Sequence, residues 1–102
     1  RLLLEAAREL GYREMIAYCL KGIGEVLAAR GTGEQAARLL GASDRLFLEL
    51  GAYVESSEQA TYAVAVEQLN DALGDDAYSS AHAEGEAMSL DQALALARAT
   101  PQ

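Results

Sequence analysis

The placement of proline and glycine constrains the fold of this chain more than any other sequence feature. The one proline is Pro101, near the end of the 102 residues. No proline ring therefore interrupts a helical hydrogen-bond ladder before that point. Alanine and leucine, both strong helix formers, occur 21 and 16 times. Apolar residues recur three or four positions apart, and no segment sustains the alternation of a strand. The sequence predicts an all-α fold of antiparallel helical hairpins.

Six helices are expected, each bounded by a glycine or by a capping serine. They cover approximately residues 2–10, 12–30, 34–50, 56–73, 77–84 and 89–99. Glycine is expected to end the first five helices, because it adopts the left-handed conformation at no steric cost; the terminators are Gly11, Gly31, Gly51, Gly74 and Gly85. Ser56 with Gln59, and Ser89 with Gln92, have the spacing of a capping box. Asp75 and Asp76 fit the positive end of a helix.

Charge is distributed unequally along the chain. The formal net charge is -8, but residues 1–50 carry seven basic and seven acidic groups. Residues 51–102 carry nine acidic groups and one basic group, Arg98. Because phosphate binding needs clustered cations, we expect no direct nucleic-acid contact by this segment and no binding to an anionic membrane surface. No apolar run approaches the roughly 20 residues of a membrane span.

A short repeat suggests how the helices are organised. Glu9-Leu10-Gly11 recurs 40 residues later as Glu49-Leu50-Gly51. The segment between them contains residues with the spacing of a tetratricopeptide repeat. They are Leu20, Ile23, Gly24, Leu27, Gly31, Ala36, Leu40 and Ser43. Gly24 and Ala36 are small, so two antiparallel helices could approach closely there. We expect one helical domain over 1–102, with a tetratricopeptide-like part over 1–51 and acidic capping helices over 56–100. An ordinary helical hairpin core would give the same small-to-large spacing.

Two longer segments carry a resemblance to a protein family. They are Gly33-Glu-Gln-Ala-Ala-Arg-Leu-Leu-Gly-Ala-Ser-Asp-Arg-Leu and Ala83-Glu-Gly-Glu-Ala-Met-Ser-Leu-Asp-Gln-Ala. From about residue 1 to 99 the chain resembles the C-terminal helical region of large bacterial regulators of the LuxR and AfsR type. The resemblance implies a solenoid fragment next to a signal-transduction ATPase domain and a DNA-binding domain. It also implies a part in transcription regulation, with a protein or peptide, or other domains of the parent chain, as partner.

A partner groove can be placed on the helix over 12–30. In a helical solenoid, the first helix of each repeat lines a concave surface that binds a peptide or a partner helix. On the repeat alignment, this surface would present Tyr18, Lys21, Glu25 and Ala28. Tyr18 would supply contact area, Lys21 and Glu25 polar selectivity, and Ala28 space. The alternative is that these four residues are ordinary exposed positions of a helix.

The sequence offers little for catalysis. His82 is the only histidine, and His82-Ala83-Glu84 lacks the Cys-x-x-Cys pair that would complete a zinc deaminase signature. We therefore expect His82 at an interface or on the surface. Cys19 is the only cysteine and is expected to be a buried, inert thiol. Gly22-x-Gly24 lies inside a helix and is no phosphate loop. We expect no enzyme activity, catalytic residue, metal or cofactor.

Two hypotheses about function follow. The first is a non-catalytic protein-interaction and signal-sensing module of a bacterial transcriptional regulator. The second is a purely structural solenoid cap and spacer between the ATPase and DNA-binding domains. A chain that starts in mid-pattern suggests a fragment, so we expect a homodimer through an exposed stripe at Leu2, Leu3 and Leu4. A single cysteine favours a reducing cytoplasm as its location.

Overall fold

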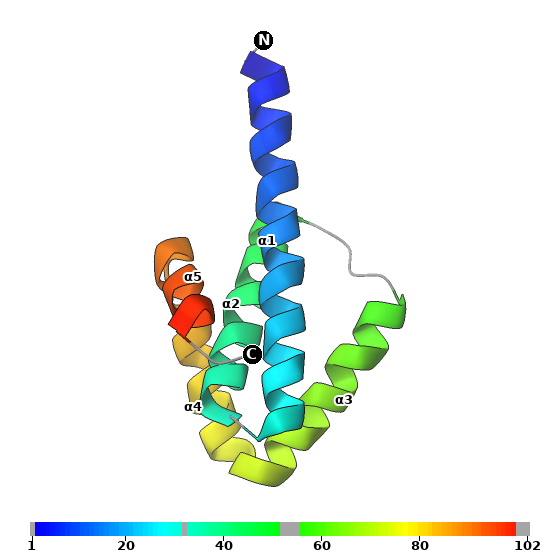
Figure 1. The fold of residues 1–102 in the computed structure, drawn as a ribbon, viewed down its shortest axis with the longest axis vertical. Coiled ribbons are helices and arrows are strands. Elements are labelled where there is room, and N and C mark those ends of the chain that lie inside the picture. The colour runs from blue at the N-terminus through cyan, green and yellow to red at the C-terminus, as the bar shows by residue number, and fades with distance from the viewer. Residues whose placement is uncertain (1, 32, 52–55, 100–102) are drawn as a thin grey trace.

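The fold is all-α, as the sequence predicts. The computed structural model describes the backbone of residues 2–31, 33–51 and 56–99, and the side chains of residues 12–31, 33–51 and 59–99. These residues form five helices: α1 (Leu2–Arg30), α2 (Gly33–Leu50), α3 (Ser56–Leu73), α4 (Asp75–Glu86) and α5 (Leu90–Ala99). The molecule measures 48 × 28 × 23 Å, with α1 along its longest direction (Figure 1).

The first helix is longer than expected, because Gly11 does not end it. Residues 2–30 form one continuous helix, α1, in place of the two that we predicted. Among the described residues, only Gly31, Gly51 and Gly74 adopt positive φ, at 86°, 63° and 86°. These three glycines end α1, α2 and α3 as predicted. Glycine tolerates a helix interior at a cost of about 1 kcal/mol, so it ends a helix only where the chain also has to turn.

The prediction for Gly85 is also wrong. We expected it to end a helix, but it lies inside α4 and is buried. A Cβ atom built on Gly85 would lie 1.9 Å from the carbonyl oxygen of Arg38, on α2. Gly85 is therefore a point of close approach between two helices. The cap of α5 is as predicted, because Ser89 N–H donates to Gln92 Oε1 (2.9 Å) and Gln92 N–H to Ser89 Oγ (3.1 Å).

The helices are arranged around α2. The pair α1 and α2 forms a long hairpin, while α3 and α4 diverge from Gly74 toward opposite sides of it (Figure 1). Helix α3 packs mainly against α1, and α4 packs against α2. Because α3 and α4 do not pack along one another, they do not repeat the first hairpin. The tetratricopeptide-like solenoid is therefore not confirmed.

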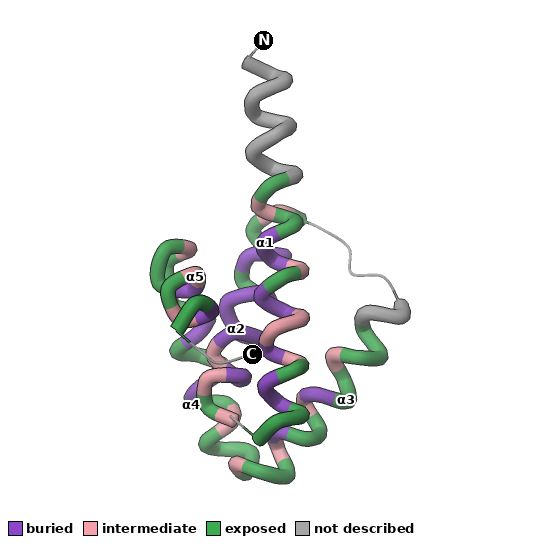
Figure 2. Tube along the Cα trace, viewed as in Figure 1, coloured by how far each residue is buried: buried purple, intermediate pink, exposed green. Residues whose placement is uncertain are grey.

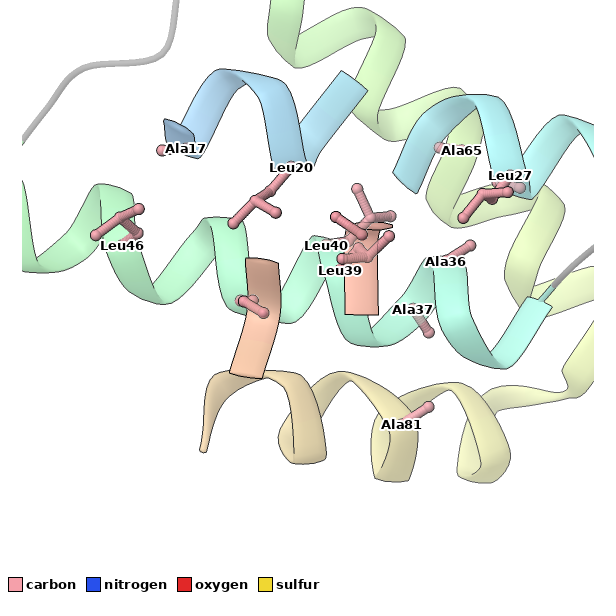
Figure 3. Packing of buried hydrophobic residues seen from close by; sticks show 14 of the residues in the cluster. Ala17, Leu20, Leu27, Ala36, Ala37, Leu39, Leu40, Leu46, Ala65 and Ala81 are labelled. Atoms are coloured by element: carbon pink, nitrogen blue, oxygen red, sulfur yellow. The ribbon is translucent and has the colours of Figure 1, made fainter. Parts of the chain in front are cut away.

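The core lies between α2 and the helices on its two sides. Ala36, Ala37, Leu39 and Leu40 of α2 have no exposed surface at all (Figures 2 and 3). These four residues lie within five positions of the helix, so their side chains point to different sides of α2. Helix α1 covers one of these sides and α4 covers another. A Cβ atom on Gly24 would lie 2.8 Å from Leu40 Cδ2. The close approach of α1 and α2 at Gly24 is as predicted.

Candidate functional site

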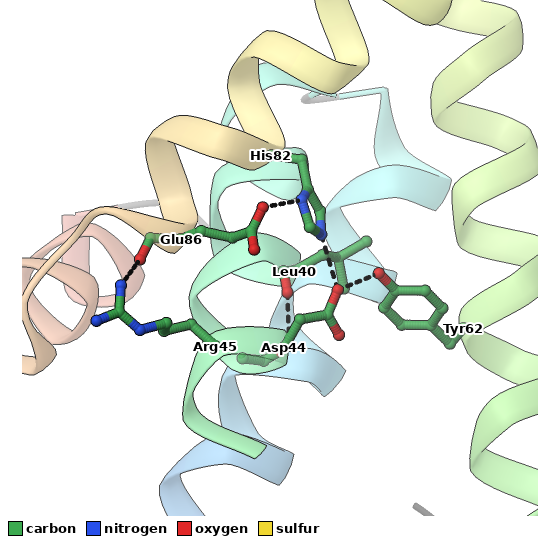
Figure 4. A network of polar contacts seen from close by, with 7 residues as sticks. Leu40, Asp44, Arg45, Tyr62, His82 and Glu86 are labelled. Atoms are coloured by element: carbon green, nitrogen blue, oxygen red, sulfur yellow. Dashed lines mark hydrogen bonds and ion pairs between the residues drawn. The ribbon is translucent and has the colours of Figure 1, made fainter. Parts of the chain in front are cut away.

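Asp44 is the point at which three helices are connected by polar contacts. It lies on α2, one residue after the fully buried Ser43. Its Oδ2 atom accepts a hydrogen bond from the hydroxyl of Tyr62, on α3. The same atom lies 2.7 Å from Nε2 of His82, on α4. Figure 4 shows the two side chains converging on this carboxylate. Asp44 therefore holds α3 and α4 to α2.

His82 has a carboxylate at each ring nitrogen. Nε2 faces Asp44, and Nδ1 lies 3.1 Å from Oε1 of Glu86, one turn further along α4. Only the imidazolium form can donate from both nitrogens at once. The hydrogen bond to Asp44 raises the pKa of His82, and the charges of Asp44 and Glu86 act in the same direction, while burial opposes them. We infer that His82 carries a positive charge in this arrangement.

Two tyrosines stay protonated around this histidine. Burial raises the pKa of Tyr62, and the hydrogen bond to Asp44 adds to the shift. Burial also raises the pKa of Tyr78, whose ring centroid lies 5.7 Å from that of His82. Near the end of α4, Arg45 Nη1 of α2 donates a hydrogen bond to the carbonyl oxygen of Glu86 (2.7 Å), which joins α4 to α2 (Figure 4).

This polar cluster is poorly suited to catalysis. A general base needs a ring nitrogen that reaches a substrate, and both nitrogens of His82 already face carboxylates of the chain. The nearby Ser43 hydroxyl is buried and donates to the carbonyl oxygen of Leu40. Within the described ranges, no group of three or more histidine, cysteine or acidic side chains is placed to hold a metal ion. The geometry favours a role in joining helices.

The four residues predicted for the partner groove differ in exposure. Lys21 and Ala28 are buried, with 2% and 8% of their surface exposed. Lys21 Nζ forms an ion pair with Glu25 Oε2 at 2.6 Å. Tyr18 is half-buried, with its ring edge-on to Phe47 at 4.8 Å between centroids. Only Tyr18 and Glu25 therefore keep surface that a partner could contact, and a partner-binding role for this set stays a prediction.

Two cavities border the α1–α2 pair. One of about 230 Å³ is lined by Lys21, Asp44, Phe47, Gln59 and Tyr62, from α1, α2 and α3. A second of about 470 Å³ lies where the α4–α5 turn meets α1 and α2; Arg13, Arg45 and Glu49 are among its charged lining residues. Arg45 Nε is paired with Glu49 there at 2.7 Å. The side chains of Asp44, Tyr62, His82 and Glu86 are called the Asp44 cluster below. Asp44 and Tyr62 of this cluster line the smaller cavity.

The outer face of α1 carries a second set of apolar side chains. Tyr12, Met15 and Val26 are 57%, 56% and 46% exposed. Cys19 is exposed as well, so the prediction of a buried thiol is wrong. These four residues, spaced by three, four and seven, lie on one face of α1 and are called the α1 stripe below. A shallow hollow of about 410 Å³ lies within it, lined by Cys19, Gly22, Ile23 and Val26.

The reasoning from sequence found one member of the Asp44 cluster and missed the others. His82 lies at the interface of α4 with α2, one of the two places expected for it. No site role is predicted for Asp44 from the sequence, although it directly follows the core position Ser43. Glu86 was not singled out, although its four-residue spacing from His82 on one helix face is visible in the sequence. The pairing of Tyr62 with Asp44 has no such local signal.

The comparisons with known proteins identify no family. No family model, curated protein or solved structure matches this chain. In the part of the chain that the structure describes, no helix is both long enough and apolar enough to span a membrane.

Proposed function

We propose that this chain is a non-catalytic interaction and signal-sensing module of a bacterial transcriptional regulator. Its place in a regulator comes from the resemblance to LuxR- and AfsR-type proteins. The interaction role is supported by one structural observation, the α1 stripe. Its occupant would be an amphipathic helix or peptide, from a partner protein or from another domain of the parent chain.

The α1 stripe supports this role because it is separate from the core. One face of α1 carries Ile16, Leu20 and Leu27, which are buried against the other helices. The stripe gives the same helix a second apolar face in contact with solvent. A helix that is apolar on more than one face is usually covered on each of them. Tyr18 is three residues after Met15 and four before Gly22, so it borders the stripe and would extend the contact area.

The alternative function is a structural cap and spacer. It is supported by the outer surface of α3, α4 and α5, where acidic side chains are exposed; they are Glu67, Asp71, Asp75, Asp76, Glu84, Glu86 and Asp91. A polar outer face is what the end of a solenoid requires for solubility. A cap needs no binding face on α1, so the two functions differ in what they expect of the stripe.

Cys19 gives a direct test, because it is the only cysteine and lies within the stripe. A photoactivatable maleimide attached to Cys19 is irradiated in an extract that contains the full-length parent protein. We expect one dominant cross-linked partner or domain, identified by mass spectrometry. Met15→Glu/Val26→Glu should abolish this product, because two carboxylates would have to be buried in the contact.

The matched control moves the reagent to another surface. In a Cys19→Ala/Asp71→Cys variant, the cross-linker lies on the exposed side of α3, among the acidic residues. The interaction role predicts that the product is lost from this variant. Equal products from both positions, or none from Cys19, would contradict it and favour the cap.

A further inference from the structure

The α1 stripe continues along the helix through Gly22 and Ala29. Gly22 is half-buried and Ala29 is exposed. With them, the outward-facing residues are spaced by three, four, three, four and three, and they are called the seam below; they are Tyr12, Met15, Cys19, Gly22, Val26 and Ala29. This is the alternation of the a and d positions in a coiled coil, where one helix packs along another. All six residues are uncharged, so the seam suits the apolar face of a partner helix.

The seam contains a hollow with the layout of a coiled-coil hole. The hollow, of about 410 Å³, is lined by Cys19, Gly22, Ile23 and Val26. The last three residues follow Cys19 by three, four and seven positions, so the four form a diamond on the surface of α1. In a coiled coil, four residues of one helix surround each side chain that the facing helix inserts. The hollow therefore has the arrangement that takes one large apolar side chain.

Packing within the described part of the chain does not explain the glycine in this hollow. Gly24, Gly41 and Gly85 also lie inside helices, and a Cβ atom on any of them would lie within 2.8 Å of an atom on another helix. A Cβ atom on Gly22 would meet nothing within 4 Å. Glycine destabilises a helix interior relative to alanine. A glycine that no neighbour requires therefore favours a close approach by a partner at this point.

The length and the edge of the seam describe this partner further. At 1.5 Å per residue, the seam rises about 26 Å from Tyr12 to Ala29, so a helix of about 18 residues would cover it. Arg30 is exposed and follows the seam directly. It lies at an edge position, where charges select the partner in coiled coils. An acidic side chain of the partner would be favoured beside Arg30.

We propose that the partner of the α1 stripe is a single amphipathic helix that packs along the seam and inserts a large apolar side chain, leucine or a larger one, into the hollow above Gly22. This inference rests on the proposed function, because it names the partner of the same surface. It assigns Gly22 as the residue that sets how closely the partner approaches, and it excludes an extended peptide as the occupant.

The test attaches the photoactivatable maleimide at the end of the seam, in a Cys19→Ala/Ala29→Cys chain. Ala29 does not line the hollow, so the reagent leaves it free. Irradiation in an extract that contains the full-length parent protein should again give one dominant product. Mass spectrometry locates the cross-linked segment of the partner. We expect this segment to carry apolar residues three and four positions apart over about 18 residues.

Adding Gly22→Leu to the same chain fills the hollow. The new side chain has space in the isolated chain, because a Cβ atom there meets nothing within 4 Å. It would overlap the side chain that the partner inserts, so we expect the yield of the product to fall about tenfold. Ala72→Leu, which adds a leucine at an exposed position of α3, is the matched control and should leave the yield unchanged. Circular dichroism checks that both variants remain helical.

Three outcomes would overturn the proposal. The first is an unchanged yield from a folded Gly22→Leu chain. The second is a product from the reagent at Cys19 but none from the reagent at position 29, since the partner would then not follow the seam. The third is a cross-linked segment without the spacing of three and four, a result that does not depend on the folding of Gly22→Leu.

These outcomes are distinct from a failure of the proposed function. In each of the three, a partner is still captured at the α1 stripe, so the interaction role stands while the helix along the seam is refuted. The absence of a product from both reagent positions would refute the interaction role and this inference together.

Discussion

At the scale of single residues, burial and partners decide the chemistry of each side chain. His82 and Cys19 are each the only residue of their type in the chain. His82 lies between two carboxylates, which favours its charged form. Cys19 lies on the exposed face of α1, although it precedes the buried Leu20 directly. Glu86 lies four residues from His82 on the same helix, but the contact of His82 with Asp44 and the exposure of Cys19 depend on how the helices pack.

The first prediction concerns the pH dependence of stability through His82. Its pKa in the folded chain is raised above the ordinary 6.5, chiefly by the hydrogen bond to Asp44. The folded state therefore binds this proton more tightly than the unfolded state does. The contribution of His82 is complete below about pH 6.5 and is lost as the pH rises through the folded value. We expect the free energy of unfolding to fall over that interval.

Urea denaturation of the wild type and of His82→Gln, at several pH values from about 6 to 9, measures this effect. Glutamine can still donate to Asp44 but does not titrate, and all other groups are common to both chains. The difference in unfolding free energy between the two chains should shrink as the pH rises. A difference that is constant across the range would show that His82 does not stabilise the fold through its charge.

At the scale of elements, two glycines allow α4 to pack directly on the backbone of α2. A Cβ atom on Gly41 would lie 2.1 Å from the carbonyl oxygen of His82, and one on Gly85 would lie 1.9 Å from that of Arg38. Each helix thus supplies one glycine to the contact, and in both cases the opposing atom belongs to a backbone. The contact places His82 and Glu84 of α4 beside α2, where Glu84 pairs with Arg38 at 3.1 Å.

The second prediction is that Gly41→Ala and Gly85→Ala each destabilise the fold. The added methyl group would meet main-chain atoms that move only if the helices separate. A loss of about 1–3 kcal/mol or more is expected from this overpacking, measured by urea denaturation.

Gly22→Ala is the matched control for this pair. A Cβ atom at Gly22 meets nothing within 4 Å, and the residue lies inside α1. Alanine should stabilise the helix there by about 0.5–1 kcal/mol. If all three variants shifted stability in the same direction and by similar amounts, the close approach of α2 and α4 would be wrong.

At the scale of the whole molecule, the continuity of α1 through Gly11 sets the shape. The first turns of α1 extend beyond the other four helices (Figure 1). The side chains of Leu2, Leu3 and Leu4 lie outside the described residues, so the structure does not test their role in a homodimer. Their helix does place them on a part of α1 that projects from the body of the molecule.

The third prediction is that the isolated chain self-associates through this projecting end. We expect Leu2, Leu3 and Leu4 to contribute apolar surface of the kind that promotes association. Light scattering should show a mass that rises with concentration, and Leu2→Glu should return the chain to a monomer. Val64→Glu, on an exposed position of α3, is the control and should not reduce association. A strict monomer at high concentration would contradict the prediction.

The sequence by itself determined the features that depend on local contacts. It predicted the all-α fold, the helix ends at Gly31, Gly51 and Gly74, and the capping box of Ser89 with Gln92. Each rests on hydrogen bonds and backbone angles within a few residues. It also placed the close approach at Gly24, because a glycine on an apolar helix face leaves room for a neighbour.

Only the tertiary structure decided the features that join separate helices. Gly11 and Gly85 look like helix ends in sequence, yet Gly11 lies within α1, and Gly85 lies within α4 and is packed against α2. Lys21 is buried, and Asp44 meets Tyr62 and His82 across 18 and 38 residues. The reason is physical: the same helices could pack in several ways, and the arrangement formed here sets which side chains become neighbours.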